Sequence, residues 1–292
     1  MIYNIIKQGQ QKAISQACRV LQFSRSSYYT AKRRIEKPAI CVASVQVKAA
    51  FVANQHCYGS RRIVDELKAQ HIIMGRYKVR RLMREAGLKP VWKKRFVNTT
   101  DSKHDLPVAE NLLNRQFNPP KLNQAWTSDI TYIRTITGWL YLAAVMDLYS
   151  RKIIGWAMSS TMPAALVCQA LQMAIGQRQT TVGLILHSDR GSQYASHEYQ
   201  ALLKQHGIIC SMSRKGNCWD NAVMERFFLN LKMERVWQRE YANQMEATQD
   251  VTEYIVGFYN CTRRHAALQN LAPIVYEIQF AAKKPIEVSV IT

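Results

Sequence analysis

The sequence predicts an α/β protein in which a mixed-sheet core follows a basic, helical amino-terminal region. Residues 121–160 contain three runs rich in β-branched and aromatic residues, which are typical of strands. Residues 161–238 then alternate helix-like and strand-like segments, whereas residues 1–90 show helical spacing of apolar residues. At 292 residues, the chain is long enough for two or three domains with at least one substantial core.

The first domain, residues 1–37, is predicted to be a helix-turn-helix. Apolar residues recur with helical spacing from Ile14 to Leu21, and Ser24 can cap a second helix that begins at Arg25. The start of the second helix of such a motif reaches base edges or phosphates. A helical hairpin without a DNA contact is the alternative. The predicted DNA-binding residues here are Arg25, Ser26, Ser27 and Tyr28.

Residues 38–92 are predicted to form a second basic helical module. Two amphipathic helices lie on either side of the connector HIIMG, with Ser60 expected to cap the first and Gly87 to end the second. A helix this basic is expected to lie on a phosphate backbone, although solvated arginines are the alternative. The basic residues predicted to bind DNA are Arg61, Arg62, Arg76, Lys78, Arg80, Arg81 and Arg84.

Residues 93–120 are predicted to be a linker because they lack sustained periodicity and end in Asn118-Pro119-Pro120. The prolines would set a semi-rigid spacing to the next domain. The basic start of the linker can track DNA, which adds Lys93, Lys94 and Arg95 to the predicted contacts.

Positive charge is concentrated in the first part of the chain. The formal net charge is +20, and residues 1–120 hold 23 Lys and Arg against 7 Asp and Glu, whereas the other 172 residues hold 17 against 13. Ordinary solvated surface charge is the alternative, but helix-turn-helix and aromatic signals accompany this excess. A nucleic-acid-binding module ahead of a nearly neutral catalytic body is therefore predicted.

The cysteines and the hydropathy pattern argue against three other classes of protein. Seven scattered cysteines include no CxxC pair, so we expect reduced packing residues in a cytoplasmic protein and no structural zinc. The chain opens with no signal peptide, and no apolar run approaches the roughly 18 residues of a membrane span. Neither secretion nor membrane insertion is predicted.

The catalytic core is predicted over residues 121–238. The runs AWTSDITYIRT, WLYLAAVMDLYS and RKIIGWAMSS have tight joins and are expected to form an antiparallel meander. Helices are then expected over residues 163–176, over 196–206 and from 219, with VGLILHSD and IICSMS as strands between them. This order predicts a ribonuclease-H-like layer. A helical extension, residues 239–292, is expected to pack on it.

Three acidic residues of this core are suited to binding metal ions. Asp129 and Asp189 are delivered by apolar strand-like runs, and Glu225 by a helix-like run. Asp129 amid apolar neighbours is costly unless a cation or proton compensates its charge. Such oxygens suit hard cations, and two Mg²⁺ ions roughly 4 Å apart can support in-line displacement at phosphorus. A solvent-facing Asp129 and a turn-forming Asp189 are the alternatives.

Two other acids compete with Glu225 for the third position. Asp220 is better explained as a cap or first-turn residue, and Glu234 lies about two and a half turns farther along the helix. Asn221 and Lys232 share a face with Glu225, so Asn221 could orient the carboxylate and Lys232 could hold a DNA phosphate. Exposed helix surface is the alternative for both.

Further residues near the predicted site could contact DNA. His187, Gln193 and Tyr194 lie on either side of Asp189, with packing as the alternative.

These segments resemble a known family, the insertion-sequence transposases whose second reading frame encodes a retroviral-integrase-like DDE core. The matching segments are WTSDITYI, HSDRGSQY, SRKGNCWDNAVMERFFLNLKME, YNCTRRHAALQNLAP with Tyr276, and the earlier YGSRRI. The resemblance covers nearly the whole chain and is specific because the order is kept, with 35 residues between Asp189 and Glu225. One departure is the size of Met224 and Arg226, since the family more often has smaller residues beside the glutamate.

The resemblance implies an activity and its partners. The DDE triad is Asp129, Asp189 and Glu225, holding two Mg²⁺ ions that Mn²⁺ can replace. The implied reaction is cleavage at the end of an insertion sequence to free a 3′-hydroxyl, followed by strand transfer through a joined-end circular intermediate. The resemblance also places Arg263, Arg264 and His265 at the border of the active site, where they are predicted to contact DNA. A homo-oligomer on double-stranded transposon ends and target DNA is expected, associated with the nucleoid. A structure-specific nuclease and a non-catalytic DNA-binding regulator are the alternatives.

Overall fold

The computed structural model describes residues 14–36, 41–90, 107–178, 180, 182–214 and 218–282. The first described unit is a pair of helices, α2 (Ile14–Val20) and α3 (Arg25–Glu36), in the predicted positions. Ser24 caps α3, because its Oγ accepts the Ser27 backbone N–H at 3.0 Å. Leu21 is exposed rather than packed. The small core of the pair consists of Cys18 and Tyr28 with Ile14, Ala17 and Phe23.

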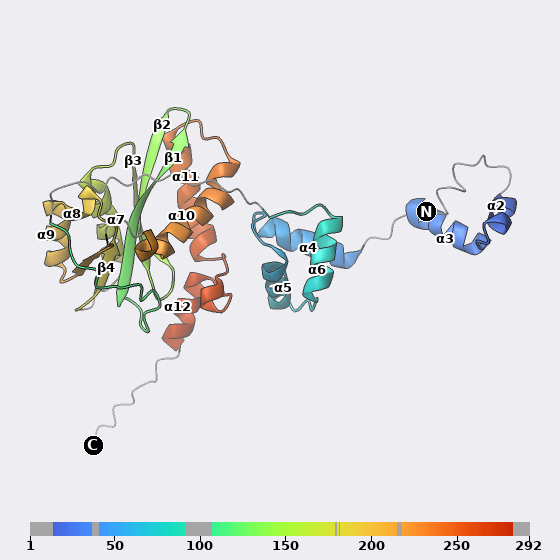
Figure 1. Cartoon of the computed structure of the whole chain (residues 1–292), viewed down its shortest axis with the longest axis horizontal. Helices are drawn as coiled ribbons and strands as arrows, with labels where there is room; N and C mark the ends of the chain where they lie inside the picture. The colour runs from blue at the N-terminus through green and yellow to red at the C-terminus, as the bar shows by residue number, and fades with distance from the viewer. Residues whose placement is uncertain are drawn as a thin grey trace, which may run out of the picture.

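The second unit has three helices, α4 (Val42–Ala53), α5 (Ser60–Ala69) and α6 (Arg76–Glu85) (Figure 1). Gly59, not Ser60, is the residue at the N-cap of α5, and no side chain caps that helix. Helix α4 was not predicted from the sequence. Its residues, VASVQVKAAFVA, are mostly apolar and show no amphipathic period. The residues buried between these helices include Val47, Phe51, Ile63, Leu67, Val79 and Leu82.

The core sheet has five strands: β1 (Ala125–Thr135), β2 (Gly138–Asp147), β3 (Ile153–Ser159), β4 (Ile185–Ser188) and β5 (Ile209–Met212). Their order is β3-β2-β1-β4-β5. The first three strands form the predicted antiparallel meander, and β4 and β5 add to β1 in parallel. The mixed α/β sheet predicted from the sequence is therefore confirmed.

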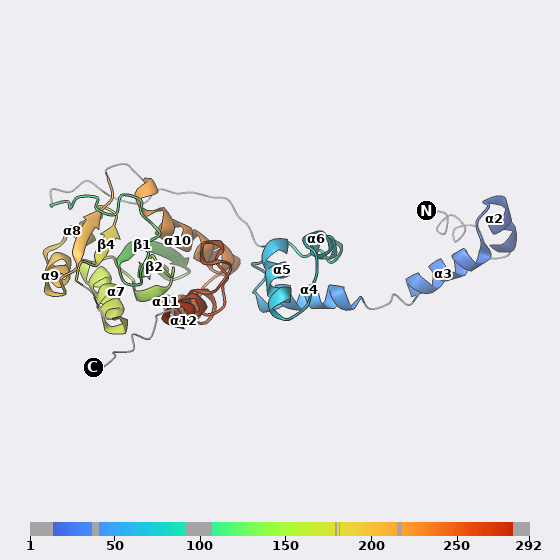
Figure 2. The ribbon, with the colours of Figure 1, turned by 90° about the horizontal axis from the view of Figure 1, so that it is seen from below.

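Helices cover both faces of the sheet (Figure 2). Helices α7 (Ala164–Gln177), α8 (Ser192–Ala195) and α9 (His197–Gln205) lie on one face, against alternate β2 residues such as Ala143 and Val145. Helix α7 crosses β3 so closely that a Cβ at Gly155 would lie 2.2 Å from the Ala170 carbonyl oxygen. The other alternate residues of β2, Leu142 and Ala144, face the second layer. From Leu142 to Met146, strand β2 is apolar because both of its faces are buried there.

The second layer consists of α10 (Ala222–Glu234), α11 (Gln244–Glu253) and α12 (Pro273–Ala282). A 3₁₀ turn, Cys218–Asn221, leads into α10, and α11 continues as a π-helix over Tyr254–Asn260. Two shorter 3₁₀ turns span Val236–Gln238 and Ala266–Leu268. Asn260, at the end of the π-helix, bonds through its side-chain amide to both the N–H and the C=O of Ile153. These bonds anchor the π-helix to the edge strand β3.

Residues 107–118, named the strap below, are packed on the core although they fall within the predicted linker. Leu113 is buried with Ala125 and Leu148, and Phe117 packs against them. The strap also bonds to β5, where the Met212 N–H donates to the Glu110 carbonyl oxygen at 3.3 Å. It has no regular secondary structure, so periodicity could not reveal it.

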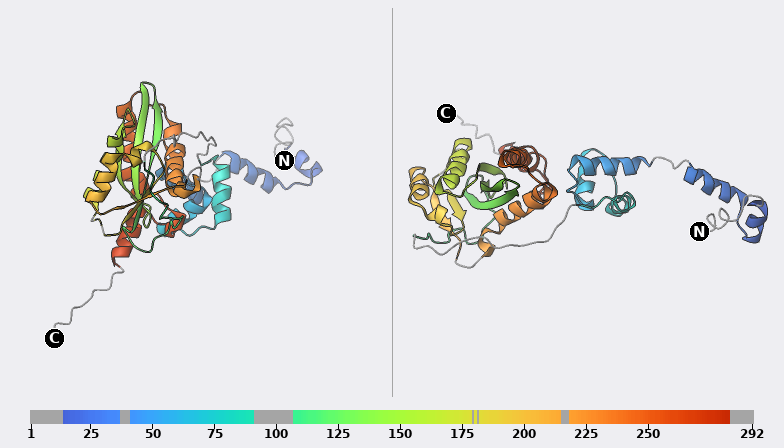
Figure 3. Two further views of the ribbon diagram at one scale, coloured as in Figure 1. Left: turned by 60° about the vertical axis from the view of Figure 1, so that its left-hand side comes forward. Right: turned by 90° about the horizontal axis from the view of Figure 1, so that it is seen from above.

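The three-helix unit contacts the carboxyl-terminal part of the core (Figure 3). The Tyr58 hydroxyl accepts the Arg264 N–H at 2.8 Å, and Arg264 Nε lies 3.0 Å from Glu66 Oε2. Arg235 donates to Gln55 at 3.2 Å. Within the described ranges, none of the helices combines the length and apolar character needed to cross a membrane.

Candidate active site

The two candidate aspartates lie on neighbouring strands. Asp129 is in the middle of β1, and Asp189 immediately follows β4. These strands are parallel, with Thr127 paired to His187. Two residues farther along each strand, Asp129 and Asp189 therefore come side by side on the same face. Both are half-buried.

Local backbone hydrogen bonds orient both aspartates. Asp129 Oδ1 accepts the Ile130 N–H at 2.8 Å, and Asp189 Oδ1 accepts the Gly191 N–H at 2.9 Å. A Cβ at Gly191 would lie 3.1 Å from that Asp189 oxygen and 3.0 Å from Gln193 Oε1. The glycine therefore allows the turn after β4 to close tightly against the carboxylate.

The electrostatics of this region are dominated by burial and by like charges. Burial raises the pKa of Asp129 well above its ordinary value, and the charges of Asp189 and Glu225 raise it further. The Ile130 N–H and the Lys232 ammonium oppose that shift. Carboxylates this close stay ionised together only when a cation compensates them.

Glu225 lies in the first turn of α10, with its side chain exposed at the edge of the pair of aspartates. Partial burial of the carboxyl raises the pKa of Glu225. Among the described residues, no three His, Cys, Asp or Glu side chains already lie close enough to hold one ion between them. The charge of Glu225 nevertheless acts on Asp129, so the structure brings the three acids into one electrostatic neighbourhood.

Asn221 joins the start of α10 to β1. Thr127 Oγ1 donates to Asn221 Oδ1 at 2.6 Å, and Asn221 Nδ2 donates to the Ser128 carbonyl oxygen at 3.2 Å. The Asn221 amide thus bonds to β1 rather than to Glu225. Thr127 was not predicted from the sequence. Its position as a polar residue inside a buried strand, two residues before Asp129, could have indicated a role near the site.

Lys232 points toward the same region from the far end of α10. Its ammonium lies 4.5 Å from the centre of the Tyr132 ring. Burial lowers the pKa of Lys232, whereas the nearby Asp129 charge raises it. Lys232 is therefore a half-buried cation beside Asp129 and not exposed helix surface.

Of the residues predicted near Asp189, two are packed in the interior. The buried Tyr194 hydroxyl lies 3.2 Å from Ser128 Oγ, and burial followed by the Asp129 and Asp189 charges raises its pKa well above the usual range. His187 is also buried, and burial lowers its pKa to about 4. For both, the packing alternative holds. Gln193 is half-buried and donates to the Met162 carbonyl oxygen at 3.2 Å.

Asp220 and Glu234, the two other acids considered for the third position of the triad, are both buried and bound to other side chains. Asp220 has no exposed surface, and both of its oxygens accept hydrogen bonds, from Asn111 and Arg115 among others. Glu234 is buried, and Arg263 binds it bidentately. Of the acids on this helix and the turn before it, Glu225 is the one whose charge acts on Asp129.

Comparisons with known proteins agree with this geometry. Models of an integrase core domain match residues 119–218 and 206–273, and a model of an HTH-like domain matches residues 43–96. The transposase InsF for insertion sequence IS3A from Escherichia coli (strain K12) is 41% identical over 283 residues, which cover 95% of this chain and 98% of that protein. The chain belongs to the IS3 family of transposases.

The chain is also similar to other known proteins. The insertion element IS600 uncharacterized 31 kDa protein from Shigella sonnei is 41% identical over 266 residues. These residues cover 90% of this chain and 98% of that protein. Among solved structures, the HTLV-2 integrase catalytic core domain in complex with magnesium matches with a TM-score of 0.41 and 14% identity, over 53% of this chain and 96% of that one. The BIV integrase catalytic core domain matches with a TM-score of 0.41 and 18% identity, over 55% of this chain and 98% of that one.

Family membership establishes the general chemistry. The protein is a transposase with an integrase-type polynucleotidyl-transferase core, and its HTH-like and transposase domains imply that it binds DNA. An integrase-type core also suggests dependence on a divalent metal.

Three of the residues predicted to contact DNA lie instead at the contact between the transposase core and the three-helix unit. Arg263 is 3% exposed and bound to Glu234, so the contact predicted for it is wrong: its charge is already paired in the interior. Arg264 binds Glu66, and Arg62 lies over the Tyr58 ring at 5.4 Å. In this conformation both side chains serve that contact.

Two other predicted contacts are also placed differently from expectation. Burial and the nearby arginines lower the pKa of His265 well below its ordinary value, and its Nε2 is buried without a hydrogen-bond partner. Tyr28 is 6% exposed in the small core of α2 and α3, so its side chain packs instead of facing DNA.

The remaining predicted contacts are on the surface or outside the described part of the chain. Arg61 is exposed, and Lys93, Lys94 and Arg95 lie outside the described residues. At the start of α3, Arg25, Ser26 and Ser27 are exposed. All five predicted basic residues of α6 are exposed as well: Arg76, Lys78, Arg80, Arg81 and Arg84.

Proposed function

We propose that Asp129, Asp189 and Glu225 form the catalytic triad of this transposase and hold two Mg²⁺ ions, which Mn²⁺ can replace. The single observation that carries the proposal is that Asp129 and Asp189 meet on neighbouring parallel strands, where the charge of Glu225 also acts on Asp129. Burial and two neighbouring carboxylates raise the pKa of Asp129. An all-oxygen site on adjacent strands suits hard divalent cations.

The residues present fit such ions. Asp129 and Asp189 are held by backbone N–H groups on neighbouring strands, so their carboxylates are already oriented. Glu225 is exposed and must turn toward the aspartates when cations bind. That movement needs only side-chain rotation, because α10 itself is fixed to β1 through Asn221.

In the proposed reaction, water attacks the phosphodiester at the end of the insertion sequence, and the freed 3′-hydroxyl then attacks a second phosphodiester. Bound divalent cations supply the charge that favours deprotonation of the attacking oxygen and stabilises the leaving oxygen. The residues of the chain orient and shield this chemistry. Tyr194 and Ser128 close the buried side of the aspartates, and Lys232 lies where an ammonium can contact a DNA phosphate beside them.

The proposed substrates are double-stranded transposon ends and target DNA. The exposed basic side of α6 would lie on the phosphate backbone, and the exposed residues Arg25, Ser26 and Ser27 would contact DNA at the start of α3. Because two ends must be joined, we propose a homo-oligomer that assembles on DNA and is associated with the nucleoid. The domain limits proposed are 1–37, 38–92, 93–120, 121–238 and 239–292, except that the strap, residues 107–118, belongs with the core rather than with the linker.

The test of this function is a joining assay. The full chain is incubated with Mg²⁺ and a labelled duplex that carries an end of the insertion sequence. A transposase produces both cleaved and joined strands, and nicks without joined strands would indicate a nuclease of the same fold. DNA binding without either product would indicate a regulator. Strand joining that survives Asp129→Asn would rule out the proposed triad.

A further inference from the structure

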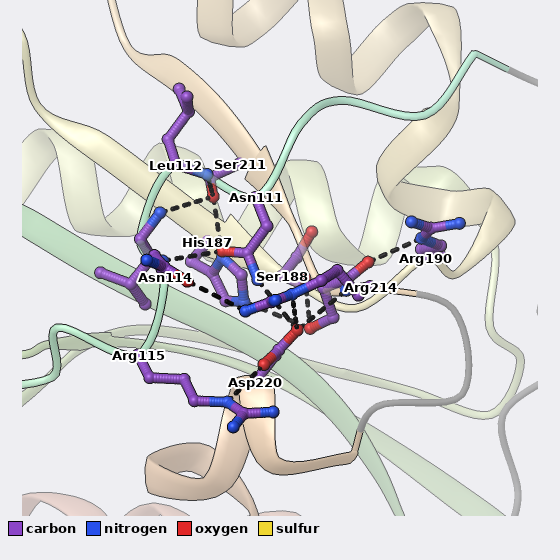
Figure 4. A network of polar contacts seen from close by, with 12 residues as sticks. Asn111, Leu112, Asn114, Arg115, His187, Ser188, Arg190, Ser211, Arg214 and Asp220 are labelled. Atoms are coloured by element: carbon purple, nitrogen blue, oxygen red, sulfur yellow. Dashed lines mark hydrogen bonds and ion pairs between the residues drawn. The ribbon is translucent and has the colours of Figure 1, made fainter.

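A buried acid that is not part of the triad holds the start of α10. Asp220 lies in the 3₁₀ turn before that helix, and four donors surround its carboxylate (Figure 4). Its Oδ2 accepts from Asn111 Nδ2 at 2.9 Å, from the Arg214 backbone N–H at 3.0 Å and from Arg214 Nε at 3.3 Å. Its Oδ1 accepts from Arg115 Nε at 2.8 Å. Asp220 therefore links the strap to the segment that follows β5.

The same polar network continues into strands β4 and β5. Ser211 Oγ accepts the N–H groups of Leu112 and Leu113 in the strap, at 2.9 and 3.2 Å. It also lies 2.9 Å from His187 Nδ1, and Ser213 Oγ lies 3.2 Å from the other ring nitrogen. Figure 4 shows these groups converging from the strap, the two strands and the turn. The strand that delivers Asp189 thus shares its hydrogen bonds with the strap.

Asp220 and its neighbour Asn221 hold the start of α10 from two sides. Asn221 binds β1 through Thr127 and Ser128, whereas Asp220 binds the strap and the segment after β5. Glu225 follows Asn221 by four residues, about one helical turn. Because the backbone between them is helical, a displacement at Asp220 is transmitted to Glu225.

We propose that Asp220 is a positioning residue for catalysis, which sets the place of Glu225 relative to Asp129 and Asp189 through its bonds to Asn111, Arg115 and Arg214. The inference rests on the proposed function, since Glu225 must act together with the aspartates. An asparagine at this position has nearly the same shape but no charge, and its amide nitrogen would place a donor where a carboxylate oxygen now accepts hydrogen bonds. Asp220→Asn therefore loosens the turn without removing any residue of the triad.

The experiment compares the full-length protein with Asp220→Asn, Asn111→Ala and the matched control Glu240→Gln, which removes an exposed acidic charge of the same core. Binding of Mn²⁺ to the DNA-free protein is followed by the loss of the free-ion EPR signal. Cleavage of an end-containing duplex is measured across the same Mn²⁺ range. We expect Asp220→Asn to weaken Mn²⁺ binding roughly 10-fold and to lower kcat, with recovery at high Mn²⁺ and no change in KM for DNA. Asn111→Ala removes one neutral donor and is expected to act in the same direction with a smaller effect.

Two outcomes separate this inference from the proposed function. If Asp220→Asn binds Mn²⁺ and cleaves like Glu240→Gln while Asp129→Asn does neither, the role of Asp220 is wrong and the triad stands. If Asp129→Asn still binds Mn²⁺ and still cleaves DNA, the proposed triad itself is wrong. Should Asp220→Asn fail to fold, Asn111→Ala decides, because an unchanged Mn²⁺ affinity in that variant overturns the inference.

Discussion

The acids of the sheet and the acids of the carboxyl-terminal helical layer are compensated in opposite ways. In the helical layer, Glu234 is bound bidentately by Arg263 and accepts the Tyr254 hydroxyl at 2.6 Å. Asp250 lies 3.1 Å from Arg235 Nε and accepts the Tyr241 hydroxyl at 2.8 Å. At the sheet, by contrast, the charges of Asp189 and Glu225 raise the pKa of the buried Asp129, and the Lys232 ammonium opposes that shift.

This difference separates structural carboxylates from functional ones. A buried carboxylate paired with an arginine stabilises the fold as long as both partners remain, whereas a cluster of like charges is a cost that the fold retains for another reason. Asp220 belongs to the first kind. Burial alone would raise its pKa, but the Arg214 N–H and the two guanidiniums outweigh burial and lower it. The following predictions test this division of the acids.

The largest effect is expected from Asp129→Asn. The substitution removes one of the three carboxylates of the proposed triad. The rates of cleavage and joining should therefore fall at least roughly 10³-fold, which corresponds to an activation barrier about 4 kcal/mol higher. The free energy of unfolding should stay the same or increase, because repulsion is relieved. Single-turnover cleavage and urea unfolding measure the two quantities. A variant that loses stability along with activity would show that Asp129 is a structural acid.

Glu234→Gln should lower the stability of the protein and leave the activity of the folded fraction unchanged. It leaves the buried guanidinium of Arg263 without its counter-charge, and breaking such a pair costs about 3–5 kcal/mol of unfolding free energy. The midpoint of urea unfolding checks the loss, with Glu240→Gln as a control for removal of an exposed acid. The fraction that remains folded should still cleave DNA. Full stability in Glu234→Gln would contradict the structural role given to this pair.

Divalent cations should stabilise the protein through the three acids of the proposed triad. At a concentration about 100 times the Kd, Mn²⁺ binding to the native state adds about 2.7 kcal/mol to the free energy of unfolding. Thermal unfolding with and without Mn²⁺ measures this gain. We expect a rise in Tm for the wild type and for Glu240→Gln, and none for Asp129→Asn. An equal rise in all three would place the cation elsewhere.

The smallest effect concerns pH and Asp220. Its pKa is lowered in the folded state, whereas the unfolded carboxyl binds its proton near pH 4. The stabilisation is therefore complete at neutral pH and is lost as the pH falls through the folded-state pKa. Asp220→Asn should cost about 2 kcal/mol at pH 7. The difference from the wild type should shrink toward pH 3 in urea titrations, and a difference independent of pH would exclude a charged role.

Much of the core could be predicted because its signals are local. The run AWTSDITYIRT became β1 without a shift of boundary, and Ser24 and Ser196 cap the predicted helices α3 and α9. Alternation and capping depend on neighbours a few residues away. The three acids were recognised for the same reason, because each lies within a distinctive local segment.

The surroundings of those acids were less predictable because their partners are remote in sequence. Arg263 and Arg264 read as basic surface, yet Glu234 lies 29 positions from the first and Glu66 lies 198 positions from the second. The strap has no periodicity, and its attachment to Asp220 spans about a hundred positions. A charged side chain reveals its partner only after folding.

The order of strands, the amphipathic helices, the excess of positive charge and the identity of the candidate metal-binding acids were determined by the sequence alone, since each depends on residue type and short spacing. Only the tertiary structure decided which charges are compensated. Compensation depends on distance in space, and folding brings arginines to Asp220, Glu234 and Asp250 while it brings carboxylates to Asp129.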